Sequence, residues 1–316
     1  MKCYTENPEV HNLCLKARYH VQRLTQENRE KGREYLEQAI MVDLNYALAY
    51  AGMSSYYWGS AFWEYLNPRE APPRAKSAAL EAVKLDDTLA EAHSALGVAL
   101  ATCDFDWTNA ESEFRRALQL NPASPDVHFS CSIFLIAAGR LDEATAEIAR
   151  ALQQDPLSPL LNAHIGALTC YARQHDAAIA QLMQTIELDP NFYYTHMFLA
   201  ICYRLKGQLE EAIASAEKAV GLSRRNSLVL GVLGACYSAA GRTAEARKLL
   251  EELKARRRVS YIAPLALGLI HLRLGEAEQG LEWFARAIQE RDLGLVCTLK
   301  TNPAYQALLR KMNLEP

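Results

Sequence analysis

Small and apolar residues recur along this sequence at a fixed interval of 34 positions. Ala110, Phe114 and Ala117 form a small–large–small pattern in which the spacings are four and three residues. Such spacings place side chains on one face of a helix. The pattern returns in two later copies, Ala144, Ile148, Ala151 and Ala212, Ala216, Ala219. These positions predict a series of amphipathic helices.

A second small position follows the same interval and marks another helix in each copy. Each of these residues comes directly after an apolar one, so a close approach between two helices is expected there. Glycine stands seven residues later in most copies, where it can adopt the left-handed conformation that ends a helix. The small positions are Ser132, Gly166, Ala200, Gly234 and Gly268, and the glycines are Gly139, Gly207, Gly241 and Gly275.

Helix starts agree with this interval. Pro122, Pro156 and Pro190 are each 34 residues apart. Ser124-Pro125 and Ser158-Pro159 each place a hydroxyl before a proline, which is a typical N-cap followed by the first helical position. Each copy is therefore predicted to be a helix, a turn and a second helix.

Together these residues resemble the tetratricopeptide repeat, over roughly residues 13 to 292. The resemblance implies an all-α fold, a right-handed α-solenoid of about eight helix-turn-helix repeats with a C-terminal capping helix. We expect an N-terminal flank over 1–12, a solenoid over 13–292 that is regular from about residue 91, and a cap over 293–316.

The copies before residue 91 are irregular. The segment QRLTQENREKG is expected to be an extended turn, and AFWEYLNPREAPP an insertion before a second helix. With the segment CDFDWTN of the third copy, these details resemble the repeat region fused behind effector domains in bacterial signalling proteins, such as winged-helix regulators, class III adenylate cyclases and Ser/Thr kinases. No effector domain is present in this sequence.

The resemblance also implies which residues face a partner, because the first helix of each tetratricopeptide repeat lines a concave groove. Here these positions are mainly aliphatic or aromatic, which favours the apolar side of a partner helix and no clamp for a terminal carboxylate. The predicted groove residues are Phe129, Ile133, Ile136, Tyr194, Met197, Ile201, Arg204, Leu228 and Leu265. The alternative is that tight curvature buries these residues within the chain.

The aromatic insertion is a second candidate contact. Trp58, Phe62 and Trp63 either pack onto the edge of the solenoid or present a surface to a partner, and we favour packing.

Charge, hydropathy and cysteine content limit the kinds of partner that this chain can bind. The net charge is −3 and no basic footprint is present, so nucleic acid is not expected as a partner. No apolar stretch is long enough to span a membrane, and membrane binding is not expected either. The eight cysteines are dispersed without a CxxC pair, which favours reduced thiols and a cytoplasmic protein.

Candidate chemistry is sparse. His93, His128 and His196 share one repeat position and are interpreted as packing residues. His164, Cys170 and His175 are rejected as a metal set, because the spacing leaves His175 near a turn. Familiar nucleophile, phosphate and metalloprotease motifs do not occur, so we expect no enzyme, no cofactor and no metal site.

The sequence therefore predicts a non-enzymatic scaffold that binds a protein or peptide partner. The alternative is a regulatory or sensory domain of a bacterial signalling protein whose effector domain lies outside this chain. Head-to-tail homodimerisation is a further arrangement that stacked repeats allow.

Overall fold

The computed structural model describes residues 7–290 and 292, and this part of the chain is all helical, as predicted. Its α-helices are α1 Pro8–Val21, α2 Gln26–Val42, α3 Ala47–Phe62, α4 Ala71–Leu85, α5 Ala90–Ala99, α6 Trp107–Leu120, α7 Pro125–Ala137, α8 Leu141–Gln154, α9 Pro159–Tyr171, α10 His175–Leu188, α11 Tyr193–Leu205, α12 Leu209–Leu222, α13 Ser227–Ala239, α14 Thr243–Arg256, α15 Pro264–Arg273 and α16 Ala277–Gln289. A short π-helix, η1 Leu100–Asp104, extends α5.

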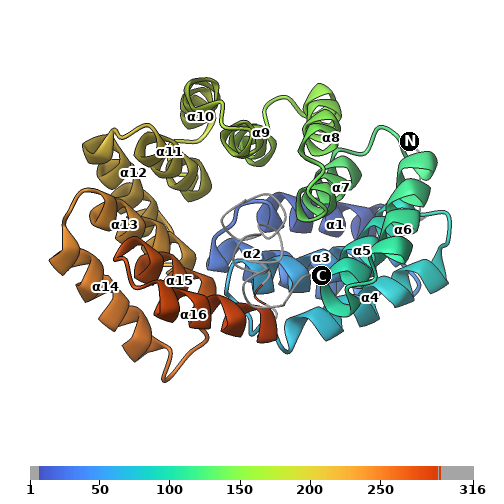
Figure 1. Ribbon diagram of the computed structural model, residues 1–316. Helices are drawn as coiled ribbons and strands as arrows, with labels where there is room; N and C mark the ends of the chain where they lie inside the picture. The colour runs from blue at the N-terminus through green and yellow to red at the C-terminus, as the bar shows by residue number, and fades with distance from the viewer. Residues whose placement is uncertain (1–6, 291, 293–316) are drawn as a thin grey trace. The chain divides into compact units, whose positions relative to one another are not determined.

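The chain divides into two compact units, Met1–Phe134 and Leu135–Pro316, and the division falls within α7. In unit 1, α1 packs on α2, α3 on α4 and α5 on α6 (Figure 1). In unit 2, α9 packs on α10, α11 on α12, α13 on α14 and α15 on α16. Each consecutive pair is thus the predicted helix-turn-helix.

The first helix, α1, begins at Pro8, inside the segment expected to be a flank. The predicted cap, residues 293–316, lies outside the described residues. The number of repeats and the hand of the solenoid stay predictions.

The small–large–small pattern forms the core of the second helices. Ala110, Phe114 and Ala117 of α6 are buried, and the corresponding residues of α8 and α12 are buried as well. The small position of the first helices is equally tight. A Cβ at Gly166 would lie 2.6 Å from a methyl carbon of Leu182, so a larger side chain would push α9 away from α10. The close approach predicted from the sequence is confirmed.

The predicted glycine turns are confirmed too. Gly139, Gly207, Gly241 and Gly275 all have a positive φ, between 74° and 81°. Arg173 occupies the same repeat position with φ 62°, although it is not a glycine.

One of the two predicted serine caps is confirmed. The Ser158 side chain accepts a hydrogen bond from the backbone N–H of Leu161, and Pro159 is the first residue of α9. The hydroxyl of Ser124 donates to the Glu91 carboxylate at 3.1 Å. Burial raises the pKa of that carboxyl group.

The first repeat corrects one expectation. The segment QRLTQENREKG is not an extended turn, because α2 begins at Gln26 and leaves a short connection. Thr25 caps the helix by accepting from the backbone N–H of Asn28. This threonine is an ordinary N-cap that the repeat pattern does not contain.

A buried arginine holds the first three helices together. Arg29 of α2 is 3% exposed. Its guanidinium donates to the Val21 carbonyl at the end of α1, and to the Tyr56 carbonyl and the Ser60 hydroxyl of α3. A Cβ at Gly59 would lie 2.4 Å from Nη2 of this arginine. The guanidinium thus fills space that only a glycine leaves open.

No helix among the described residues combines the length and apolar character that a bilayer crossing requires.

Candidate functional site

Alternate helices of unit 2 form one continuous face. α9 contacts α11, α11 contacts α13, and α13 contacts α15, so the first helices of successive repeats lie beside one another. We call the side of α11, α13 and α15 that carries the predicted groove residues Tyr194, Met197, Ile201, Arg204, Leu228 and Leu265 the first-helix face.

Burial varies along α11 on this face. Tyr194 and Met197 are 9% and 3% exposed, whereas Ile201 and Arg204, one to two turns later, are half-buried. Only the C-terminal half of this helix therefore leaves side chains within reach of a partner.

The predicted groove residues of α13 and α15 also differ in how deeply they are buried. Leu265 of α15 is buried in a cluster with Phe284 and Ala287 of α16, and Leu228 of α13 packs against the same cluster while staying half-buried. These two predicted groove residues thus contribute to the packing between repeats.

In α7, Phe129 and Ile133 are half-buried and Ile136 is buried. Asp126 on the same helix forms an ion pair with Arg18 of α1 at 2.7 Å, and it also accepts from Gln22 at 3.1 Å. Within unit 1, this end of α7 is therefore occupied by the chain itself.

The aromatic residues at the end of α3 pack on one another. Trp58 and Phe62 stack at 5.3 Å between ring centroids, and Phe62 meets Trp63 edge-on at 4.7 Å. Trp63 is 7% exposed, while Trp58 and Phe62 are half-buried. Trp63 is therefore not available as an exposed contact in this structure.

Histidines at the shared repeat position have one common role. Nε2–H of His128 donates to the Pro122 carbonyl at 2.9 Å, and Nε2–H of His196 donates to the Pro190 carbonyl at 2.9 Å. His93 makes the equivalent bond to Asp87 at 2.8 Å. Each ring thus ties its helix to the preceding loop.

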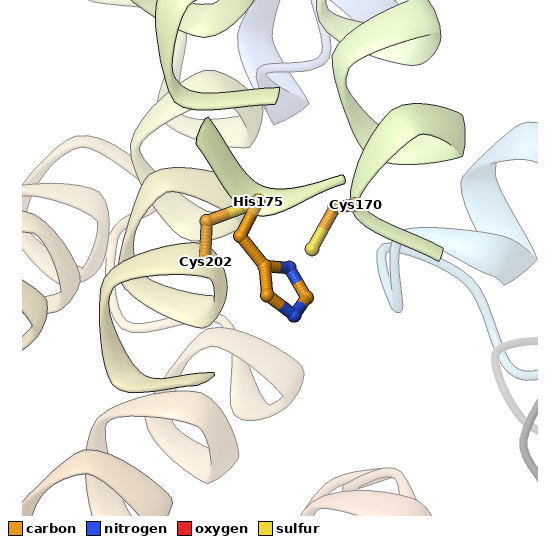
Figure 2. A group of neighbouring side chains, drawn as sticks. All are labelled: Cys170, His175 and Cys202. Atoms are coloured by element: carbon orange, nitrogen blue, oxygen red, sulfur yellow. The ribbon is translucent and has the colours of Figure 1, made fainter. Parts of the chain in front are cut away.

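Three other donors converge in unit 2, within the part of the chain that the structure describes. Cys170 ends α9, His175 begins α10 and Cys202 lies in α11. Their sulfur and nitrogen atoms all lie within 4.8 Å of one another. Figure 2 shows the imidazole ring of His175 beside the side chains of the two cysteines. Sequence reasoning missed this group because Cys202 belongs to the next repeat, 27 residues beyond His175.

The two thiols of this group interact directly. The neighbouring Cys202 thiol lowers the pKa of Cys170, whereas the Cys170 thiol together with burial raises the pKa of Cys202. Both cysteines are buried, at 3% and 0% exposure, whereas His175 is half-buried. The cluster therefore contains one thiol that is more acidic than usual.

Comparison with known families identifies the repeats. A family model described as tetratricopeptide repeat matches residues 104–165 and 204–265, and a second model with the same description matches residues 171–227. No curated protein matches the chain.

Several solved structures are similar to this chain. Pseudomonas aeruginosa PilF matches with a TM-score of 0.52 and 18% identity, over 73% of this chain and 96% of its own. The human IFIT1 dimer with m7Gppp-AAAA matches with a TM-score of 0.61 and 18% identity, over 89% and 72%. Yeast Tom70 matches with a TM-score of 0.55 and 15% identity, over 99% and 66%. At these identities the similarity concerns the fold alone. With the two family models and the helix pairs, it establishes that the chain is a tetratricopeptide-repeat protein.

Proposed function

We propose that the chain is a non-enzymatic scaffold that binds the apolar side of a partner helix on the first-helix face of unit 2. Its fold supports the binding of protein or peptide partners. The observation that carries the finer proposal is the pair Ile201 and Arg204, which stay partly exposed on α11 while the residues before them are buried.

A helical partner suits this arrangement. The half-buried predicted groove residues on this face are Leu228 of α13 and Ile201 and Arg204 of α11, so its accessible part is mostly apolar. An amphipathic helix offers apolar residues at three- and four-residue spacing and can place them along such a surface.

Other partner classes fit less well. The human IFIT1 dimer holds m7Gppp-AAAA, but its identity to this chain is 18%. The net charge of −3 and the apolar side chains provide little attraction for phosphate. We also propose that the protein works in the cytoplasm, because its dispersed cysteines suit a reducing compartment.

The test compares two variants that each place a glutamate on unit 2. Ile201→Glu alters the first-helix face, and Met183→Glu is the matched control, because Met183 is an exposed apolar residue of the second helix α10. Both proteins are used as bait in native lysate with a metal chelator present, after far-UV circular dichroism has shown equal helicity.

We expect a captured protein that is retained by the wild type and by Met183→Glu and is lost from Ile201→Glu. A synthetic helix from that protein should then bind the wild type at least tenfold more tightly than Ile201→Glu. Equal capture by all three baits would contradict the assignment of the face. If sedimentation shows a concentration-dependent dimer that Ile201→Glu abolishes, the occupant is a second copy of this chain.

A further inference from the structure

The donors of the Cys170, His175 and Cys202 group come from three successive helices of unit 2. Sulfur and imidazole nitrogen are the ligands that Zn²⁺ and related thiophilic ions prefer. In a tetrahedral site with Zn–S of about 2.3 Å and Zn–N of about 2.0–2.1 Å, neighbouring donors lie roughly 3.5–3.8 Å apart. The present separations, all within 4.8 Å, therefore need a contraction of at most about 1.3 Å, which small side-chain rotations can supply.

A second observation points to a ligand at the same place. Nδ1 of His175 is buried and has no hydrogen-bond partner among the described residues. A buried polar atom without a partner is unfavourable and uncommon in native proteins. Coordination of a metal ion by this nitrogen would satisfy it without any other change in the fold.

Charge balance agrees with this interpretation. Two thiolates and one neutral imidazole around a divalent cation give a complex with no net charge. Such a complex can be buried at a lower cost than an isolated ion.

We propose that Cys170, His175 and Cys202 bind a thiophilic divalent metal ion, for which Zn²⁺ is the natural probe, with water at the fourth position. The ion would connect the turn between α9 and α10 to α11 of the next repeat. This site is independent of the partner proposed above. A disulfide between Cys170 and Cys202 is the competing use of the thiols, but it would leave Nδ1 of His175 unpartnered.

The test uses Co²⁺ as a spectroscopic probe of the reduced, full-length protein. Thiolate ligands produce a charge-transfer absorption in the near ultraviolet, and a tetrahedral site produces strong d–d bands in the visible. Zn²⁺ affinity is then measured by competition with a chromophoric chelator. The variants are Cys170→Ser with Cys202→Ser, His175→Gln, and the control Cys236→Ser, which removes a buried thiol at the same repeat position as Cys202, 34 residues later.

We expect one Co²⁺ per wild-type chain with both kinds of band, and displacement of that Co²⁺ by Zn²⁺. The double cysteine variant should lose the charge-transfer band, and Cys236→Ser should keep it. His175→Gln should fold, because His175 is only half-buried, and its Zn²⁺ affinity should fall roughly 100-fold or more, since even residues that only support a ligand contribute 10–100-fold. Zn²⁺ should raise the melting temperature of the wild type but not of the double variant.

Two results would overturn the proposal. One is a reduced wild-type protein that shows no thiolate–cobalt band, or a double variant that keeps it. The other is a Cys170–Cys202 disulfide found by peptide mapping of protein alkylated before reduction, together with no cobalt binding after reduction. That second result would assign the pair to a redox switch.

Discussion

One hydrogen bond recurs at a single repeat position and explains a group of histidines. The side chain at this position donates to a carbonyl six residues earlier, in the loop before its helix. The pairs are His93 with Asp87, His128 with Pro122, Asn162 with Pro156, and His196 with Pro190. Asn162 makes the same hydrogen bond as the histidines do. This repeat position therefore requires a hydrogen-bond donor and not a metal ligand.

His164 differs from these residues because its environment opposes protonation. Burial lowers its pKa to about 4, against 6.5 for an ordinary histidine. Between these values the unfolded chain binds a proton at this histidine and the folded chain does not. The free energy of unfolding is therefore highest above pH 6.5, where both chains are neutral at this site, and it falls as the pH drops toward 4. The loss amounts to about 3 kcal/mol. Burial also lowers the pKa of His196, which contributes in the same direction.

The pH dependence should therefore be reduced in His164→Leu. We expect the free energy of unfolding of the wild type, measured with urea between pH 7.5 and pH 4, to fall by about 3 kcal/mol more than that of the variant. His196 and the carboxylates remain in both proteins and provide the common background. Parallel curves for the two proteins would show that His164 is protonated equally in the folded and unfolded chains.

At the scale of elements, the first helices of several repeats end in the same way. The N–H of the residue after the left-handed position donates to a carbonyl five residues earlier, as in Arg140 to Leu135, Gln208 to Tyr203 and Arg242 to Tyr237. Gln174 makes the same bond to Thr169, although the left-handed residue before it is Arg173. The turn is therefore preserved where the glycine is not.

Arg173→Gly should stabilise unit 2. A left-handed conformation costs an L-residue roughly 1–2 kcal/mol, while glycine costs about 0.5–1 kcal/mol in lost freedom, so the net gain is about 0.5–1 kcal/mol. Gly207→Ala is the reciprocal change and should destabilise by about 1 kcal/mol, although a Cβ there would meet nothing within 4 Å. Urea unfolding with a chelator present measures the free energy of unfolding of each variant. A lower value for Arg173→Gly than for the wild type would contradict the assignment of backbone strain to Arg173.

The sequence predicts such elements well where a residue type has a specific conformational role. The glycine turns, the alanine-lined second helices and the Ser158 cap all follow from the 34-residue pattern. The 34-residue interval places Arg173 at the same turn position, but its residue type gives no sign of the left-handed conformation, which non-glycine residues rarely adopt. The Cys170, His175 and Cys202 group was also missed, because its recognition requires the directions of side chains on two different repeats.

At the scale of the whole molecule, repeat proteins gain stability from contacts between neighbours, so distant repeats need not unfold together. The sequence predicted this helical stacking but not which first-helix residues would be buried. Met197 and Ile201 lie one helical turn apart and are both apolar, yet only Met197 is fully buried. The difference depends on the neighbouring helices and not on residue type.

The two units should unfold in separate transitions. Trp58, Trp63 and Trp107 lie in unit 1 and Trp283 in unit 2, so fluorescence of Trp283→Phe reports on unit 1 alone, while circular dichroism reports on both. Arg29→Met leaves the carbonyls of Val21 and Tyr56 without this donor and should destabilise unit 1 by roughly 2–4 kcal/mol.

We therefore expect Arg29→Met, introduced into Trp283→Phe, to shift the fluorescence transition to lower urea and to leave the second dichroism transition in place. Arg33→Met is the matched control on the same helix, because its ion pairs with Glu30 and Glu37 are partly exposed and contribute less than about 1 kcal/mol. A single transition that moves as a whole would show that the two units unfold cooperatively.

The position of Arg29 also bears on the order in which the chain is made. A nascent chain that has reached only α2 has the arginine and the Val21 carbonyl, but the Tyr56 carbonyl and the Ser60 hydroxyl are still missing. Closing α1 onto α2 at that stage would leave a charged group partly unsatisfied. The first repeat is thus expected to complete its folding only after the ribosome has released the end of α3, which makes the second repeat a folding partner of the first during synthesis.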